Sequence, residues 1–143
     1  TLFLVLVLLW QLSEDGVDVN LENNNAELLL LTSLQDVSLL QGRVHPETVV
    51  EVQNINFDKY VVIALFRGWK PSYNYQTVIE RITHQDGQLT VYAQFWEPSP
   101  QWESAAAETS PYHIVKFRRS DIQNDHPKLV LQTIIITPTP PAP

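Results

Sequence analysis

The sequence predicts a mainly β domain of the α+β class, an antiparallel sheet or sandwich-like meander of about six strands with one short helix. Three observations predict it. Short runs rich in valine, isoleucine, leucine and aromatic residues recur along the chain. Glycine, proline, asparagine and aspartate separate these runs at short intervals, which favours turns between consecutive strands. One stretch carries apolar residues at the spacing of a helix.

The clearest strand is 59–66, KYVVIALF, which is apolar on both faces. A strand of this kind is covered on both sides, so it belongs near the middle of a sheet. Two alternating segments follow it, 74–83 and 89–96, and Asp86-Gly87 lies between them. Because Asp-Gly supplies the positive φ angles of a tight turn, these two segments are expected to form a hairpin.

The other elements are assigned from shorter patterns. Leu34, Val37 and Leu40 share one face of a short helix, expected at 33–41, that ends just before Gly42. The segment 43–56 is ambiguous between a strand and the tail of a helical excursion. Further strands are expected at 27–32, 112–118 and 128–136.

Both ends of the chain differ in composition from the middle, which places the domain at 13–136. Residues 1–12 contain the apolar run 2–10, LFLVLVLLW, far shorter than the ~20 residues of a membrane-spanning helix. This run is either the remnant of a truncated signal peptide or membrane anchor, or a first buried strand. The former predicts an extracytoplasmic protein, secreted, periplasmic or anchored through this segment alone. Residues 137–143, TPTPPAP, form a proline-rich tail.

Charge and cysteine content narrow the range of partners. The formal net charge is −7, and a field of that sign repels nucleic acid at long range, so no nucleic-acid partner is expected. The absence of cysteine removes disulfides, thiolate metal sites and cysteine nucleophiles together. The basic residues Lys116, Arg118 and Arg119 end a strand and are expected to lie in water.

No catalytic, metal or cofactor site is expected, and the chain is not predicted to be an enzyme. The four histidines lack a second ligand at the spacing of known metal sites. Ser110 and His113 are three residues apart on a strand, which puts them on opposite faces and not in reach as nucleophile and base. His113 is expected instead to be partly buried and to donate to a backbone carbonyl. With only four glycines, phosphate cradles are excluded as well.

Aromatic residues and prolines gather on two loops, 67–75 and 97–111. If the meander brings both loops to one end, they form a patch typical of interaction hot spots, because Trp and Tyr bury large areas and keep a polar handle. The alternative is ordinary closure of the core at that end. The expected partner-binding residues are Trp69, Lys70, Pro71, Tyr73, Trp96, Trp102 and Tyr112.

Three segments carry a family likeness: FDKYVVIALFRGWKPSYNY (57–75), VIERITHQDGQLTVYAQFWEPSP (78–100) and TSPYHIVKF (109–117). Together they resemble the C-terminal domain of the protease complex subunit PrcB family. The family pattern has a glycine after the hydrophobic strand, then a basic residue and proline, and later a Thr-Ser-Pro-Tyr-His segment. The matching positions here are Gly68, Lys70, Pro71, Thr109, Ser110, Pro111, Tyr112 and His113.

The chain departs from the family pattern after the proline. Where the family carries Thr-Gly-Gly-Tyr, this sequence has Ser72, Tyr73, Asn74 and Tyr75. Glycine pairs allow turns that are closed to other residues, so this loop is expected to differ in shape and in any specificity that it holds.

The resemblance implies an exported bacterial protein-binding or accessory domain, often a lipoprotein, that supports assembly or stability of a surface protease complex. Its expected partner is therefore a protein, with a protease as the first candidate. Two alternatives stay open. The turn at 70–75 is also loosely similar to the loop of a small β-sandwich peptidase inhibitor. The acidic, aromatic loop at 97–111 would suit a carbohydrate-binding or hydrolase domain.

Overall fold

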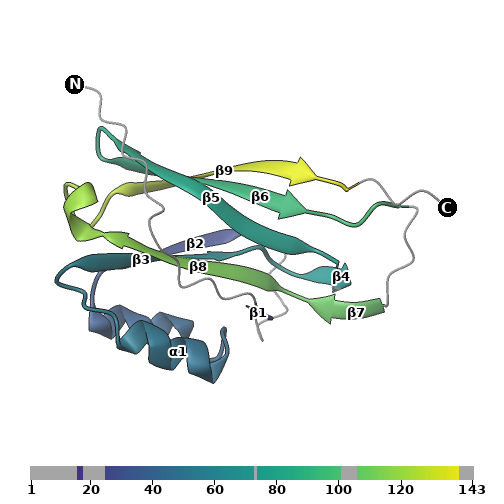
Figure 1. Cartoon of the computed structure of the whole chain (residues 1–143), viewed down its shortest axis with the longest axis horizontal. Helices are drawn as coiled ribbons and strands as arrows, with labels where there is room; N and C mark the ends of the chain where they lie inside the picture. The colour runs from purple at the N-terminus through teal and green to yellow at the C-terminus, as the bar shows by residue number, and fades with distance from the viewer. Residues whose placement is uncertain (1–15, 18–24, 73, 101–105, 139–143) are drawn as a thin grey trace.

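The computed structural model describes residues 16–17, 25–72, 74–100 and 106–138 (Figure 1). The apolar run 2–10 and the expected contact residues Tyr73 and Trp102 lie outside the described residues. The α+β, mainly β fold class is confirmed. The elements are β1 (Gly16–Val17), β2 (Glu27–Leu31), η1 (Leu34–Leu40), α1 (Pro46–Gln53), β3 (Tyr60–Phe66), β4 (Lys70–Ser72), β5 (Gln76–Gln85), β6 (Gln88–Trp96), β7 (Ala106–Thr109), β8 (Pro111–Arg118), η2 (Arg119–Asp121) and β9 (Lys128–Ile136).

These strands form two packed sheets and a small ribbon. The larger sheet has the order β1-β8-β3-β2, and its neighbours are antiparallel. The second sheet has the order β5-β6-β9, and β4 pairs with β7 in the ribbon. Figure 1 shows the two sheets as stacked layers, with α1 on the outer side of the larger sheet. The arrangement is a sandwich with helices on one face.

Strand β3 is central, as expected from its apolar pattern. Val61, Ile63 and Leu65 face the second sheet and are fully buried among residues of β5, β6 and β8. The intervening Val62 and Ala64 face the helices and are fully buried too. Strand β3 therefore contributes side chains to two separate cores.

The helical layer covers the outer face of the larger sheet. Helix η1 lies at the expected position and buries Val37 and Leu40. The ambiguous segment 43–56 contains helix α1, which the single expected helix did not include. Pro46 occupies the first turn of α1, where its missing N–H costs nothing, and Val52 is buried against the sheet.

The second sheet is mixed. Its hairpin is confirmed, because Asp86 and Gly87 adopt φ angles of 52° and 76° in the turn between β5 and β6. Strand β9, however, pairs with β6 in parallel, not in the antiparallel order of a simple meander. The chain leaves β8 in one sheet, passes through η2 and enters the other sheet at β9. A parallel pair needs a crossover of this kind, which local turn signals do not reveal.

Among the described residues, no helix is long and apolar enough to span a membrane, and the longest, α1, has eight residues.

The inter-sheet core predicts a clear contrast between two leucines. Leu65 is fully buried between the sheets, so Leu65→Ala should lower the free energy of unfolding by about 2–5 kcal/mol, through lost apolar burial and the cavity left behind. Leu34, on η1, is 60% exposed, and Leu34→Ala should change it by less than about 0.5 kcal/mol. Urea unfolding followed by circular dichroism measures both. Equal costs would contradict the described core.

Candidate partner-docking surface

Arg67 organises the end of the sandwich where β3 stops. It directly follows the all-apolar strand, yet it is only 3% exposed. Its Nη1 donates to the carbonyl oxygens of Trp96 at 2.8 Å and Gln76 at 3.1 Å, and its Nη2 donates to Glu97 Oε1 at 2.9 Å. Its backbone N–H donates to the carbonyl of Pro111 at 2.9 Å. One residue thus ties together the start of β5, the end of β6 and the start of β8.

The Arg67 guanidinium also contacts aromatic rings. Its central carbon lies 4.4 Å from the ring centre of Phe95 and 5.2 Å from that of Tyr75, distances that give a cation–π attraction. Burial lowers the pKa of Arg67, and the charge of Glu97 opposes that shift. Because the ordinary pKa of arginine is so high, the Arg67 side chain stays charged at every physiological pH and keeps all of its N–H donors.

Lys70 brings a second cation to the same end. Its Nζ lies 5.9 Å from the ring centre of Tyr75. Burial lowers the pKa of Lys70, the positive charge of Arg67 lowers it further, and Glu97 partly offsets both. The charged form is therefore less favoured here than in water. An acidic group supplied by a partner would relieve that cost.

We call Trp69, Lys70, Pro71, Tyr75 and Trp96 the docking end. Pro71 is exposed, and the other four are half-buried. Gly68 turns the chain from β3 into β4 with a φ of 96°, an angle that favours glycine. Trp96 donates from Nε1 to Gln94 Oε1 at 3.2 Å, which fixes its ring. The two expected loops converge, because β4 pairs with β7 and Arg67 bonds Glu97. Half-buried aromatic residues therefore share this end with an exposed proline and a cation.

Buried polar atoms without partners concentrate beneath the docking end. Among the described residues they include Arg67 Nε and the hydroxyls of Ser72, Thr77 and Ser110. Unsatisfied buried groups are rare in well-packed cores, and each one costs about 1–3 kcal/mol. The docking end therefore leaves more buried polar atoms without hydrogen-bond partners than the two apolar cores do.

The structure corrects the expectation for Tyr112. This residue was expected on the contact surface, but it is 0% exposed and sits in the core under the helices. Its hydroxyl accepts a hydrogen bond from the His45 N–H at 3.2 Å, and its ring centre lies 5.9 Å from that of Phe66. Tyr112 anchors the start of α1 on the sheet, so it is not available to a partner.

His113 is more deeply buried than expected, with 5% of its surface exposed, and its Nδ1 accepts a hydrogen bond from the backbone N–H of Ile79 at 2.8 Å. The expected donation to a backbone carbonyl stays a prediction. The ladder between β5 and β6 shifts register between Ile79 and Arg81, which turns the Ile79 N–H toward β8. His113 therefore joins the two sheets through one hydrogen bond and has a structural role.

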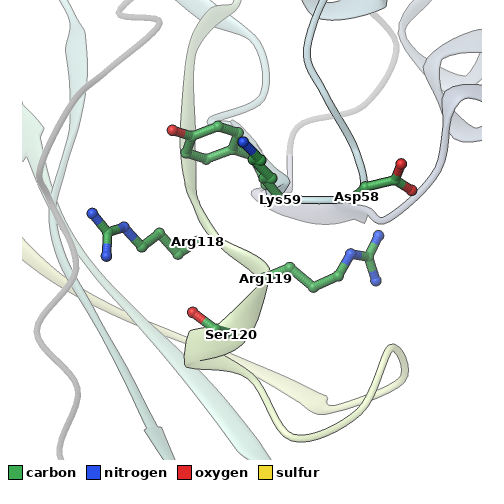
Figure 2. Close-up of a pocket in the computed structure, with 6 residues that line it drawn as sticks. Asp58, Lys59, Arg118, Arg119 and Ser120 are labelled. Carbon is green, nitrogen blue, oxygen red and sulfur yellow. The ribbon is translucent and has the colours of Figure 1, made fainter.

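A basic pocket lies at the opposite ends of β3 and β8 (Figure 2). It encloses about 580 Å³ and is lined by Asp58, Lys59, Tyr60, Arg118, Arg119 and Ser120. Figure 2 shows Arg118 and Arg119 leaving the ribbon in opposite directions. Lys116 is close by, with its Nζ 4.4 Å from the Tyr60 ring centre. This corner is locally basic in a protein of net charge −7.

Arg119 holds neighbouring segments of the chain together at this corner. Its Nε donates to the carbonyl of Phe57 at 2.8 Å, its Nη1 pairs with Asp125 Oδ1 at 2.5 Å, and its Nη2 donates to the carbonyl of Thr32. These bonds join three separate segments. Arg118 is exposed, as expected for a residue that ends a strand in water, whereas Arg119 is half-buried. The pocket is an open hollow beside Arg119.

Of the functional residues, Arg67 was missed by the sequence analysis. The available signal was a charged residue placed directly after an all-apolar strand and before a glycine. Such a residue either reaches water or finds buried partners, and the sequence alone does not separate the two. Among the described residues, no group of three or more His, Asp or Glu side chains is placed to hold a metal ion.

Comparison with known protein families gives a match to part of the chain. Residues 61–118 match the family described as PrcB C-terminal, which confirms the resemblance seen in the sequence. The matched region runs from the second residue of β3 to the last residue of β8, so it includes the whole docking end. Searches of curated proteins and of solved structures found no match to the chain.

The hydrogen bonds of Arg67 predict that substitutions of Arg67 and of Glu97, the two members of its ion pair, lower stability by unequal amounts. Arg67→Met leaves the carbonyls of Gln76 and Trp96 and the carboxylate of Glu97 without their buried donor, so it should lower the free energy of unfolding by about 3 kcal/mol. Glu97→Gln keeps an acceptor on a side chain that is 37% exposed, and should cost less than about 1 kcal/mol. Chemical denaturation measures both. Equal losses of stability would show that the ion pair with Glu97, and not the hydrogen bonds to the two carbonyls, organises this end.

Proposed function

We propose that this chain is an exported bacterial accessory domain that binds a protease complex through its docking end and supports the assembly or stability of that complex. The observation that carries the proposal is the set of contacts made by Arg67, which bonds the Trp96 carbonyl and packs against the Tyr75 ring. Trp69, Tyr75, Trp96 and Lys70 are half-buried at this end, within the segment that matches the PrcB C-terminal family. Half-buried tryptophan and tyrosine on a rigid support are typical of binding hot spots.

A rigid frame favours binding because little ordering is required when a partner arrives. Arg67 fixes the start of β5 and the end of β6 through backbone carbonyls, so Tyr75, just before β5, and Trp96, at the end of β6, are already placed. The partner surface that fits is apolar at its centre, to cover the rings, with an acidic group at its rim opposite Lys70. That chemistry is common on protein surfaces, which favours a protein partner.

A hydrolase role has less support from the geometry. Glu97 Oε1 accepts from Arg67, so the described acidic residue nearest the aromatic rings is already used to brace the loop. Glu108 is exposed on β7, and Glu103 lies outside the described residues. A proton donor for glycoside cleavage needs a second carboxyl group at a defined separation. Of the two carboxyl groups that this reaction needs, the described residues offer Glu97, and Glu97 has a structural role.

The test uses the purified full chain as bait in extracytoplasmic extracts of the bacterium that produces it, with chemical crosslinking and mass spectrometry. We expect a protease to co-purify with the wild-type protein. Trp69→Ala combined with Trp96→Ala should weaken that binding by at least about tenfold, because two hot-spot rings are lost. Circular dichroism confirms that the variant is folded.

Val50→Ala is the matched control. Val50 is a 54% exposed apolar residue on α1, away from the docking end, so binding should be unchanged. Protease capture that both variants retain would overturn the proposed surface.

The activity of the captured protease separates an accessory domain from an inhibitor. An accessory domain should leave peptide hydrolysis unchanged or raised as the chain is added. A peptidase inhibitor would abolish it in a dose-dependent manner, and the double tryptophan variant would restore it. Inhibition across cysteine or serine proteases would therefore replace the accessory role with the inhibitor.

A further inference from the structure

Strand β9 is one of the two edge strands of the second sheet. In the part of the chain that the structure describes, β6 is the one strand hydrogen-bonded to it. Figure 1 shows β9 as the yellow strand along the margin of its layer. It runs for nine residues, KLVLQTIII, without an internal proline or glycine. It lies outside the segment that matches the PrcB C-terminal family, so it is a feature of this chain beyond that match.

The backbone of β9 has a defined inner and outer side. The N–H of Lys128 donates to the carbonyl of Gly87, and the carbonyl of Ile136 accepts from the N–H of Glu97, both at 2.9 Å. Even-numbered residues therefore face β6. Because backbone groups alternate along a strand, the odd-numbered residues direct their N–H and C=O groups away from the sheet. These residues are Leu129, Leu131, Thr133 and Ile135.

The other described edges of the two packed sheets carry protection that β9 lacks. Strand β2 is short and begins with Glu27, which pairs with Arg43 at 3.2 Å. Strand β5 contains a register shift beside Glu80 and Arg81, and such irregularities discourage pairing. Strand β1 has two residues. In β9, by contrast, Ile134 and Ile135 are 54% and 56% exposed.

Charge also favours contact between two copies at this edge. The chain carries 16 acidic and nine basic residues, so two copies repel each other at long range. None of the acidic residues lies on β9, whose one charged residue is Lys128 at its start. The paired strands themselves therefore bring no carboxylates opposite each other.

We infer that β9 pairs with β9 of a second copy, in antiparallel order, about a two-fold axis at Gln132. In this register Leu129 lies opposite Ile135 of the other copy, and Leu131 lies opposite Thr133. All outward N–H and C=O groups of the strand then find partners, with two hydrogen bonds for each opposed pair of odd-numbered residues. A shift of two residues places Ile135 opposite Pro127, which has no N–H, or Leu129 opposite Thr137, beyond the strand.

The side chains match in the same register. On one face Val130 meets Ile134, and the two Gln132 amides lie opposite each other. On the other face half-buried Leu129 meets exposed Ile135. The exposed isoleucines of each copy are thus covered by the apolar first half of the other strand. The product is a continuous six-stranded sheet, and the contact closes on itself because both copies use the same surface.

The first test is the mass of the full chain in solution, by light scattering on a sizing column over a range of concentrations. We expect a dimer for the wild-type protein. Ile134→Lys places a charge opposite Val130 of the other copy and should raise the dissociation constant at least about tenfold. Val50→Lys, at an equally exposed valine on α1, should leave the dimer intact. A monomer at every concentration, open-ended aggregates, or equal effects of the two lysines would overturn the inference.

The second test reads the register. The chain has no cysteine, so a single introduced thiol reports only on its own symmetry mate. Gln132→Cys lies on the axis, where opposed Cα atoms are roughly 4.5 Å apart, and should form a disulfide-linked dimer under mild oxidation. In Ile134→Cys the two thiols are separated by about four residues, or roughly 13 Å, and should not link. Linking of Ile134→Cys in preference to Gln132→Cys would overturn the proposed pairing.

Discussion

Strand β3 is apolar on both faces, and the rest of the molecule is arranged to cover it. Val61, Ile63 and Leu65 require a layer on one side, and Val62 and Ala64 require one on the other. A single antiparallel meander provides only one such layer. The second sheet and the helices η1 and α1 together satisfy both faces. The three-layer order of the chain is thus a consequence of where its most apolar strand lies.

The same constraint shapes the docking end. A strand buried on both faces must leave the core somewhere, and here the next residue is charged. Arg67 stays inside and takes the carbonyl oxygens of Gln76 and Trp96 as its partners. These carbonyls lie where β5 begins and β6 ends, so satisfying one buried charge also aligns two strands. The aromatic residues of the docking end owe their placement to that alignment.

Local patterns in the sequence were sufficient for the long strands and for η1, but not for α1, for the short strands β4 and β7, or for which strands are neighbours. The Asp86-Gly87 turn and the double-sided β3 were predictable because each depends on a few adjacent residues. The parallel pairing of β9 was not, since it depends on a crossover between sheets. Burial of Tyr112 was likewise hidden, because the side chain is covered by α1, from a segment whose pattern was ambiguous. Of the seven expected contact residues, Trp69, Lys70 and Trp96 lie half-buried at the end organised by Arg67, and Pro71 lies exposed there.

The proposed dimer has a geometric consequence for the proposed function. Strands β6 and β9 are parallel, and Ile136 lies beside Trp96 at the docking end. In an antiparallel β9 pair, Ile136 of one copy lies opposite Lys128 of the other, at the far end of the second sheet. The two docking ends therefore point in opposite directions and cannot close on a single site. An accessory domain built in this way would bridge two partner subunits, and bridging raises overall binding strength without any new contact to either one.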